Sequence, residues 1–394
     1  MSRTLQRIAA WSALSALVTI GLLLGAVVRL ARSSVTPPKH REYPMRILGV
    51  DRQRSQLVLN DNAESRVAGN IGIWFGHDAG YLRAGKILSI DHGRVVRELI
   101  EVVSGTPRVG QRARESGWFY LGPWEIEGRY QNVTVSGEVG ELPAWLIEPT
   151  QQDTEHADDW VIHVHGRTST RAETLRGAAM ATQAGWRSLV ISYRNDKSAP
   201  RSVDGRYGLG STEARDVLAA IRYAGMHGAK RVVLFGWSMG GAACVQAARI
   251  AQLEPELPPI VGLILESPAL SWPEIFRHHA RLMHAPQIGG DLVSGVLTSS
   301  LAPLLTGVAH PLDWGQLDGV STAIELQLPI LLLHSRDDDY VPFESSARLA
   351  ALEPGLVRYL EFSGAGHVRL WNQDPERWER EVRGWLAERA EPNG

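Results

Sequence analysis

The sequence has almost no cysteine: Cys244 is the only one among 394 residues. A single thiol excludes an internal disulfide and a cysteine-based metal cluster, and it leaves the redox compartment open. The net charge of −2 provides no overall field that would attract nucleic acid or another polyanion. The chain also has no internal repeat and no low-complexity tract. Because 44% of the residues are hydrophobic, we expect a globular chain with a sizeable core, whose oligomeric state stays open.

One long uncharged hydrophobic run is present, at residues 8–28. It is rich in Leu, Ala, Val and Ile and is long enough to span a bilayer as a helix. Arginine follows where a signal-peptide cleavage site would need small residues, so the pattern favours an uncleaved single-pass anchor in the cell membrane. Basic residues are denser after the run than before it, but large domains translocate regardless of such charges. The sequence therefore predicts a membrane anchor and leaves the side of the following domain open.

The segment after this run predicts a linker and then a β-rich region. Residues 29–42 form the linker, which includes the stretch SSVTPPK. Residues 43–120 contain short strand patterns separated by turn residues, without helical periodicity or a catalytic motif. They predict either a small β-rich domain or an extension of the main sheet. The clearest strands are Gln56–Leu59, Lys86–Ile90 and Val95–Val103.

Strand and helix patterns alternate from residue 121 to residue 390, which indicates βαβ units and a mostly parallel sheet with helices on both faces. Residues 267–325 interrupt this alternation with amphipathic helical stretches at Pro273–Met283 and Asp291–Leu305. Such an insertion either covers a pocket as a lid or packs without a gating role. The predicted strands of the alternating part are Tyr130–Ser136, Pro143–Ile147, Trp160–His165, Ser188–Tyr193, Arg231–Phe235, Ile260–Leu265, Ile330–His334 and Val357–Phe362.

The most informative motif is G-x-S-x-G, which lies in the segment RVVLFGWSMGG at residues 231–241. An apolar strand precedes it and a helix of small residues follows. At such an elbow a sharp turn exposes the serine hydroxyl, so Ser238 is the candidate nucleophile. Gly236 and Gly240 suit a turn at which two backbones pass too closely for a Cβ atom. The backbone N–H of Met239 is the first candidate donor to an oxyanion.

A serine nucleophile needs a general base, which is commonly a histidine held by a carboxylate. His367 follows the last predicted strand in the segment SGAGH, whose glycines let the loop turn back toward the elbow. Three adjacent aspartates at residues 337–339 follow another buried strand and supply the acid. Glu266, at the end of the strand after the nucleophile helix, is the alternative acid. The histidines of the insertion, His278, His279 and His284, are interpreted as surface residues.

A second oxyanion donor is expected from the loop after the strand that ends in His163-Val164-His165-Gly166. The backbone N–H of Arg167 is the candidate. His163 and His165 could also be metal ligands in an H-x-H pattern, but no further cluster supports this alternative. We therefore expect no metal site.

These motifs, in this order, resemble those of α/β-hydrolase-fold serine hydrolases over residues 121–390. The resemblance is strongest to the branch of serine aminopeptidases, dienelactone hydrolases and prolyl-oligopeptidase-type domains. Within it, residues 334–342 match the spacing H-G-x-x-D-x-x-V-P, with Ser335 in place of the glycine, which assigns Asp338 as the acid. Asp337 and Asp339 are then turn or cap residues. The other matching pieces are His165-Gly166, Tyr193-Arg194-Asn195, Gly236–Gly241 and Gly364–His367.

The resemblance implies a serine hydrolase that cleaves an ester, thioester or amide through an acyl-enzyme and needs no cofactor. The expected hydrophobic anchor and the apolar insertion favour a small-molecule or lipid acyl ester as the substrate. A peptidase of the same fold, an acyltransferase and a non-catalytic binding protein are the alternatives. The motifs are specific for fold and mechanism and not for substrate.

Overall fold

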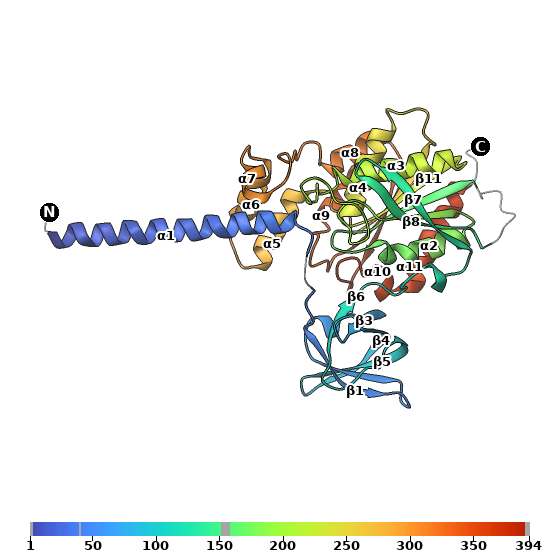
Figure 1. The fold of residues 1–394 in the computed structure, drawn as a ribbon, viewed down its shortest axis with the longest axis horizontal. Helices are drawn as coiled ribbons and strands as arrows, with labels where there is room; N and C mark the ends of the chain where they lie inside the picture. The colour runs from blue at the N-terminus through green and yellow to red at the C-terminus, as the bar shows by residue number, and fades with distance from the viewer. Residues whose placement is uncertain (1–2, 39–40, 151–157, 391–394) are drawn as a thin grey trace.

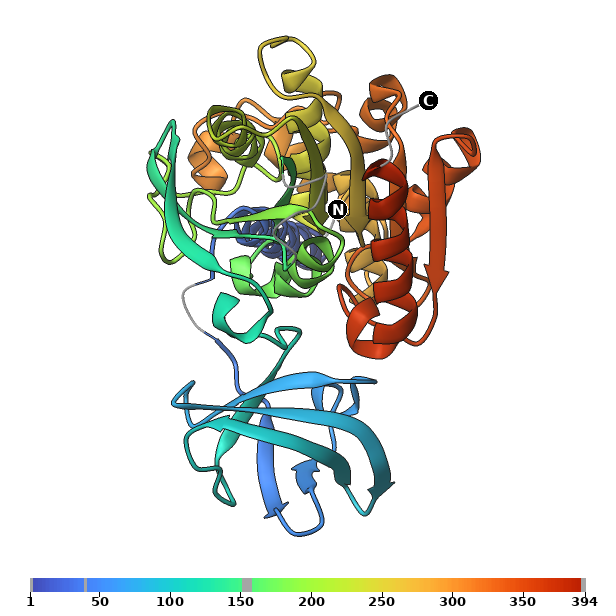
Figure 2. The ribbon, with the colours of Figure 1, turned by 90° about the vertical axis from the view of Figure 1, so that its right-hand side faces the viewer.

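The computed structural model describes residues 3–38, 41–150 and 158–390, which form two β-sheets (Figures 1 and 2). The first sheet is a closed antiparallel barrel with the strand order β1-β2-β5-β4-β3-β6. This closure makes it a separate β-rich unit rather than an extension of the main sheet, and the expected β-rich N-terminal region is confirmed. Its strands are β1 (Met45–Asp51), β2 (Gln56–Asn60), β3 (Ile71–Phe75), β4 (Gly80–Asp91), β5 (Arg94–Ser104) and β6 (Arg112–Ser116).

The barrel interior is filled by alternate side chains of its strands, as the period of two predicts. Fully buried examples are Met45 and Ile47 of β1, and Leu57 and Leu59 of β2. The barrel also buries one guanidinium, that of Arg97 in β5. Burial lowers the pKa of Arg97 to about 10, so the group stays charged at neutral pH. Its nitrogens donate at 2.5–3.0 Å to the carbonyl oxygens of Ser65, Val67, Gly69 and Gly85.

The second sheet has eight strands in the order β14-β13-β12-β11-β9-β10-β8-β7. The pairs β7–β8 and β8–β10 are antiparallel, and all the others are parallel. The central strands are buried on both faces, which is why they are continuous apolar runs in the sequence. The strands are β7 (Tyr130–Gly137), β8 (Gly140–Ile147), β9 (Asp159–Val164), β10 (Arg187–Ile191), β11 (Arg231–Trp237), β12 (Ile260–Glu266), β13 (Ile330–Ser335) and β14 (Val357–Phe362).

Helices cover both faces of this sheet. On one face lie α3 (Glu213–Met226), α4 (Met239–Ala251), α8 (Gly319–Leu326) and α9 (Glu344–Leu352). On the other lie α2 (Leu175–Gln183), α10 (Leu370–Gln373) and α11 (Pro375–Ala390). Successive residues of a central strand serve opposite cores: Leu234 of β11 packs with the first set of helices, and Phe235 packs with the second. The expected doubly wound, mostly parallel sheet is therefore present.

The insertion between β12 and β13 forms helices beside the N-terminal helix. They are α5 (Trp272–Leu282), α6 (Ile288–Thr298) and α7 (Ala302–Thr306), and α8 follows them. The predicted helix at Asp291–Leu305 is thus two helices, interrupted near Ser299. The N-terminal helix α1 (Arg3–Ser34) projects from the body, and its C-terminal turns lie along α5, α6 and α7 (Figure 1).

The prediction of a membrane anchor is wrong. The predicted single-pass localisation in the cell membrane and the membrane as a partner depend on that anchor and are wrong with it. Over the described part of the chain, no helix combines the length and the apolar character that crossing a bilayer requires. The C-terminal turns of α1 instead contribute to the protein interior, since Ala31 and the following Val35 are fully buried in the main core. The number of apolar residues in the sequence does not distinguish a helix whose end packs into the protein core from a helix whose side chains face lipid. The helix also extends through Ser34, into the segment expected to be a linker.

Candidate active site

The turn between β11 and α4 holds Ser238 in a strained backbone conformation, with φ of 53° and ψ of −119°. Two glycines make this turn possible. A Cβ on Gly236 would lie 2.6 Å from the carbonyl oxygen of Gly240, and a Cβ on Gly240 would overlap the carbonyl oxygens at the end of β9. The strand, the turn and the helix therefore approach one another as the motif predicts.

The parallel register of the sheet brings the motif-bearing loops together. Gly236 of β11 pairs with Val164 of β9, so the loops that follow these strands lie side by side. Likewise, Ser335 of β13 pairs with Phe362 of β14, and this register places the aspartate and histidine loops next to each other. All four loops leave the same edge of the sheet because their strands run parallel.

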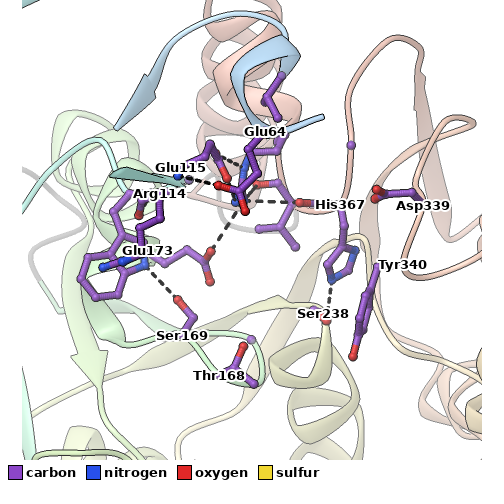
Figure 3. Close-up of a pocket in the computed structure, with 18 of the residues that line it drawn as sticks. Glu64, Arg114, Glu115, Thr168, Ser169, Glu173, Ser238, Asp339, Tyr340 and His367 are labelled. Carbon is purple, nitrogen blue, oxygen red and sulfur yellow. Dashed lines mark hydrogen bonds and ion pairs between the residues drawn. The ribbon is translucent and has the colours of Figure 1, made fainter. Parts of the chain in front are cut away.

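Ser238, His367 and Asp338 form one chain of hydrogen bonds. The Nε2 atom of His367 lies 2.9 Å from Ser238 Oγ, as the dashed line in Figure 3 marks. The Nδ1 atom lies 2.9 Å from Oδ2 and 3.1 Å from Oδ1 of Asp338. Such a contact lets the carboxylate fix the imidazole tautomer, while the other ring nitrogen faces the serine hydroxyl.

Asp338 has an environment that keeps its carboxylate ionised. Burial opposes the charge, but the charge of His367 and hydrogen bonds from His334 and His367 outweigh it and hold the pKa well below its ordinary value. Oδ1 also accepts the backbone N–H groups of Tyr340 and Val341 at 2.9 and 2.8 Å. The carboxylate is thus fixed in position as well as in charge.

The other candidate acids have different partners. Asp337 accepts the backbone N–H of Gly364 at 2.6 Å and so holds the loop that carries His367. Asp339 is exposed at the rim of the cavity described below. Glu266 is fully buried, and its carboxylate accepts the indole N–H groups of Trp237 and Trp378 at 3.0 and 2.9 Å. The structure therefore brings Asp338, and not Glu266, to His367.

The loop after β9 passes directly over the nucleophile. A Cβ on Gly166 would lie 3.1 Å from Ser238 Cβ and 3.8 Å from its Oγ. Arg167, the next residue, and Met239, the first residue of α4, are the two expected oxyanion donors. Neither backbone N–H is among the donors that the turns and loops of the described residues use. Both are therefore available to a reacting carbonyl oxygen.

A buried ion pair that sequence reasoning missed supports this loop. His165 Nε2 lies 2.8 Å from Asp196 Oδ2, and His165 Nδ1 lies 2.9 Å from the carbonyl oxygen of Gly166. Burial opposes protonation, but the carboxylate of Asp196 outweighs it and raises the pKa of His165. The Tyr193 hydroxyl donates to the same Gly166 oxygen at 2.9 Å. Two donors thus fix the peptide whose N–H belongs to Arg167.

His163 and His165 do not share a metal-binding arrangement. The ring of His163 lies beside the stacked rings of Phe235 and Trp237 in β11. Its Nε2 lies 3.1 Å from Ser188 Oγ, and burial lowers its pKa to about 3. Among the described residues, no group of three or more His, Cys, Asp or Glu side chains could hold a metal ion. Of the insertion histidines, His284 is exposed, as expected. His279 is instead half-buried, and its Nε2 lies 2.9 Å from the carbonyl oxygen of Tyr340, in the loop that carries Asp338.

Ser238 opens into a cavity of about 700 Å³ that both sheets line. Figure 3 shows Glu64, Arg114 and Glu115 from the barrel side, facing Ser238 and His367. The barrel is held there by an ion pair in which Arg369 donates to both carboxylate oxygens of Glu115, at 2.8 and 3.0 Å. The sequence of residues 43–120 gave no sign of this role, because ion-pairing residues without a motif look like ordinary surface residues.

The mostly parallel sheet and the strand–helix elbow between β11 and α4 define a class of protein: the hydrolases of the α/β fold. The chain belongs to the alpha/beta hydrolase family, whose model matches residues 161–381. This match confirms the family and the fold expected from the motifs. Residues 46–116, the barrel, match a domain of unknown function, DUF8805. None of the curated proteins matches this chain.

Solved structures of similar fold include esterases. One crystal form of the Pyrococcus furiosus esterase Pf2001 superposes with a TM-score of 0.51 at 18% identity, over 68% of this chain and 94% of that chain. A second crystal form gives 0.50 at 19% identity, over 68% and 93%. The Butyrivibrio proteoclasticus protein Est1E, with ferulic acid bound, gives 0.49 at 17% identity, over 65% and 98%. At these identities the likeness to Pf2001 shows the α/β-hydrolase fold alone.

Proposed function

We propose that this protein is a serine hydrolase of the carboxylesterase type, which cleaves an ester through an acyl-enzyme. The observation that carries the proposal is the hydrogen-bond chain from Ser238 through His367 to the ionised Asp338. The family match and the esterase fold of Pf2001 support the same chemistry. We also propose that residues 121–390 are the catalytic domain and that residues 267–325 cover its site.

The proposed reaction begins when Ser238 Oγ attacks the ester carbonyl and its proton moves to His367 Nε2. Asp338 stabilises the imidazolium that forms. The N–H groups of Met239 and Arg167 would donate to the oxyanion of the tetrahedral intermediate. His367 then protonates the departing alcohol, and a water molecule activated by the same imidazole releases the acid from Ser238.

The geometry around Gly166 gives the second donor its support. Because His165 and Tyr193 both donate to the Gly166 carbonyl oxygen, the peptide plane is set before substrate binds. A donor that needs no reorganisation during the reaction stabilises a developing charge most effectively. Peptide hydrolysis and acyl transfer would use the same catalytic groups. They differ from ester hydrolysis in the leaving group, which is an amine for a peptide, and in the acyl acceptor, which is an alcohol rather than water for an acyltransferase.

The test uses a fluorophosphonate probe, which reacts with an activated serine, followed by competition with acyl esters, thioesters and peptide amides. We expect stoichiometric labelling of the wild-type protein, complete loss of labelling in Ser238→Ala, and competition by esters before amides. Ser65→Ala is a matched control, because Ser65 is a buried serine in the barrel. A folded wild-type protein that the probe does not label would disprove the proposal. Labelling that persists in Ser238→Ala would place the nucleophile elsewhere.

A further inference from the structure

A second cavity, of about 430 Å³, lies between α1 and the insertion helices α5 and α6. Its walls are mainly aliphatic and aromatic. Leu23 and Val27 of α1 form one side, and Phe276 of α5 with Ile288 and Leu292 of α6 form the other. We call this cavity the α1 groove. The residues that form its α1 side lie outside the 161–381 segment that matches the family.

The α1 groove has little capacity for a polar ligand. No Asp, Glu or Lys is among the described residues that line it. The hydroxyls of Ser33 and Ser34 donate to carbonyl oxygens of their own helix, at 2.8 and 2.7 Å. Burial lowers the pKa of His279, so its ring is neutral at neutral pH. An apolar occupant therefore fits these walls, since it leaves no buried polar group without a partner.

The α1 groove adjoins the Ser238 cavity. Arg167 and Tyr340 line both of them. The Arg167 guanidinium donates to the Tyr340 hydroxyl, and the Tyr340 ring centroid lies 5.1 Å from that of His367. The Tyr340 ring and the aliphatic part of Arg167 therefore form the shortest connection from the reacting carbonyl to the α1 groove, along which an apolar chain would lie.

We propose that the α1 groove binds the apolar acyl chain of the substrate, and that the polar alcohol part lies in the cavity under the barrel. This inference rests on the proposed esterase function and adds the class of substrate: esters of medium-length or longer apolar acids with a polar alcohol. The side chains that line the two cavities differ in polarity, as this assignment requires. Glu64, Arg114 and Glu115 line one, and hydrocarbon side chains line the other.

The experiment measures kcat/KM for p-nitrophenyl esters from acetyl to octanoyl in wild type and in variants that fill the α1 groove. Gly289 lines the groove, and a Cβ added there meets no atom within 4 Å, so Gly289→Trp fills the space without a local clash. Gly295 is the matched control, because it lies in the same helix, is equally open and does not line the groove. Ala26→Trp, with Gly25→Trp as its control, tests the opposite wall on α1.

In wild type, each methylene that enters the groove should raise kcat/KM by about fourfold until the space is full. We therefore expect octanoyl esters to exceed acetyl esters by at least about tenfold. Gly289→Trp and Ala26→Trp should remove this preference and leave acetyl hydrolysis within about twofold of wild type, whereas both controls should keep the preference.

Two results would overturn the assignment while the esterase function stands. One is acetyl hydrolysis without any chain-length preference in wild type. The other is an equal loss for acetyl and octanoyl esters in correctly folded Gly289→Trp and Ala26→Trp. Absence of fluorophosphonate labelling at Ser238 is a separate result, which would overturn the proposed function and this inference together.

Discussion

The barrel and the α/β sheet both bury charged groups, but they satisfy them in opposite ways. In the barrel, the guanidinium of Arg97 donates only to backbone carbonyl oxygens, so no other side chain shares or exchanges its charge. In the sheet, the buried carboxylates among the loops at the strand ends are paired with side chains: Asp196 with His165, and Asp338 with His367. Hydrogen bonds from Arg97 to carbonyl oxygens stabilise the conformation of the backbone, whereas a histidine–carboxylate pair can also accept or release a proton.

The barrel and the sheet therefore contribute different things to the cavity that they share. The sheet supplies groups whose protonation states depend on one another, as the proposed catalysis requires. The barrel supplies a wall whose position depends on the segment that Arg97 holds. That segment continues into Asn70, whose backbone N–H donates to the Asn372 carbonyl oxygen at 2.7 Å, on the sheet side of the cavity. The comparison predicts that changes in the sheet affect chemistry and that changes in the barrel affect local stability.

The largest effect is expected from Asp338→Asn. The amide would present the wrong hydrogen-bonding pattern to His367 and favour the inactive tautomer, so kcat should fall by about 10⁴-fold. Steady-state ester hydrolysis measures this loss. The neighbouring changes Asp337→Asn and Asp339→Asn are the matched controls and should alter kcat by less than about tenfold. A large loss in Asp339→Asn with little in Asp338→Asn would reverse the assignment of the acid.

The next effect concerns the barrel. Arg97→Met leaves the carbonyl oxygens around it buried without a donor, so we expect the barrel to lose about 3–5 kcal/mol of stability. Hydrogen exchange followed by mass spectrometry should show lost protection in β1–β6 and retained protection in β9–β13. Arg94→Met, a change of an exposed arginine in the same strand, should leave both regions as in wild type. Equal loss of protection in both sheets would mean that the two regions unfold as one unit.

How far the sequence predicts this molecule differs between the same two regions. In the sheet, the proposed function and the strand pattern point to the same residues, because Ser238 and Asp338 each follow a buried apolar strand and His367 follows the edge strand β14. The barrel also has strand periodicity, and its short strands were recognisable. Its closure was not, because it depends on long-range pairing such as that of Met45 with Ala113, and no local pattern specifies that pairing.

Two features of the site were beyond sequence reasoning for physical reasons. The pairing of His165 with Asp196 joins residues from the loops after two different strands, and only the sheet order places them together. The C-terminal turns of α1 pack on a complementary surface of α6 and α7, whereas Leu22 and Leu23 earlier in the helix are exposed. The apolar residues alone, without that surface, suggested a bilayer. In both cases the sequence shows which residues are present but not which residues they contact in the folded protein.

The smallest effect, and the sharpest test of the contrast, is the pH dependence contributed by His165. Its pKa is raised in the folded protein, so the pair with Asp196 stabilises the fold fully below the ordinary histidine value of about 6.5. That stabilisation is lost as the pH rises through the raised pKa, because the folded state must then release the proton. Thermal unfolding of wild type and His165→Gln between pH 5.5 and 9 measures it. We expect wild type to be the more stable at low pH, and the difference in Tm to narrow as the pH rises.

The difference between the two proteins is the informative quantity, because other groups titrate in the same range and cancel in it. His279, for example, has a lowered pKa and therefore destabilises the fold as the pH falls, in wild type and variant alike. The charged neighbours of the pair are Glu173 and Arg171, and the Tyr193 ring stacks on His165 with the centroids 4.2 Å apart. Arg97→Met should show no such narrowing, since a guanidinium keeps its charge throughout this range. If the difference in Tm between wild type and His165→Gln is the same at every pH, the His165–Asp196 pair keeps its charge over this range, as Arg97 does. That result would contradict the proposed difference between the sheet and the barrel.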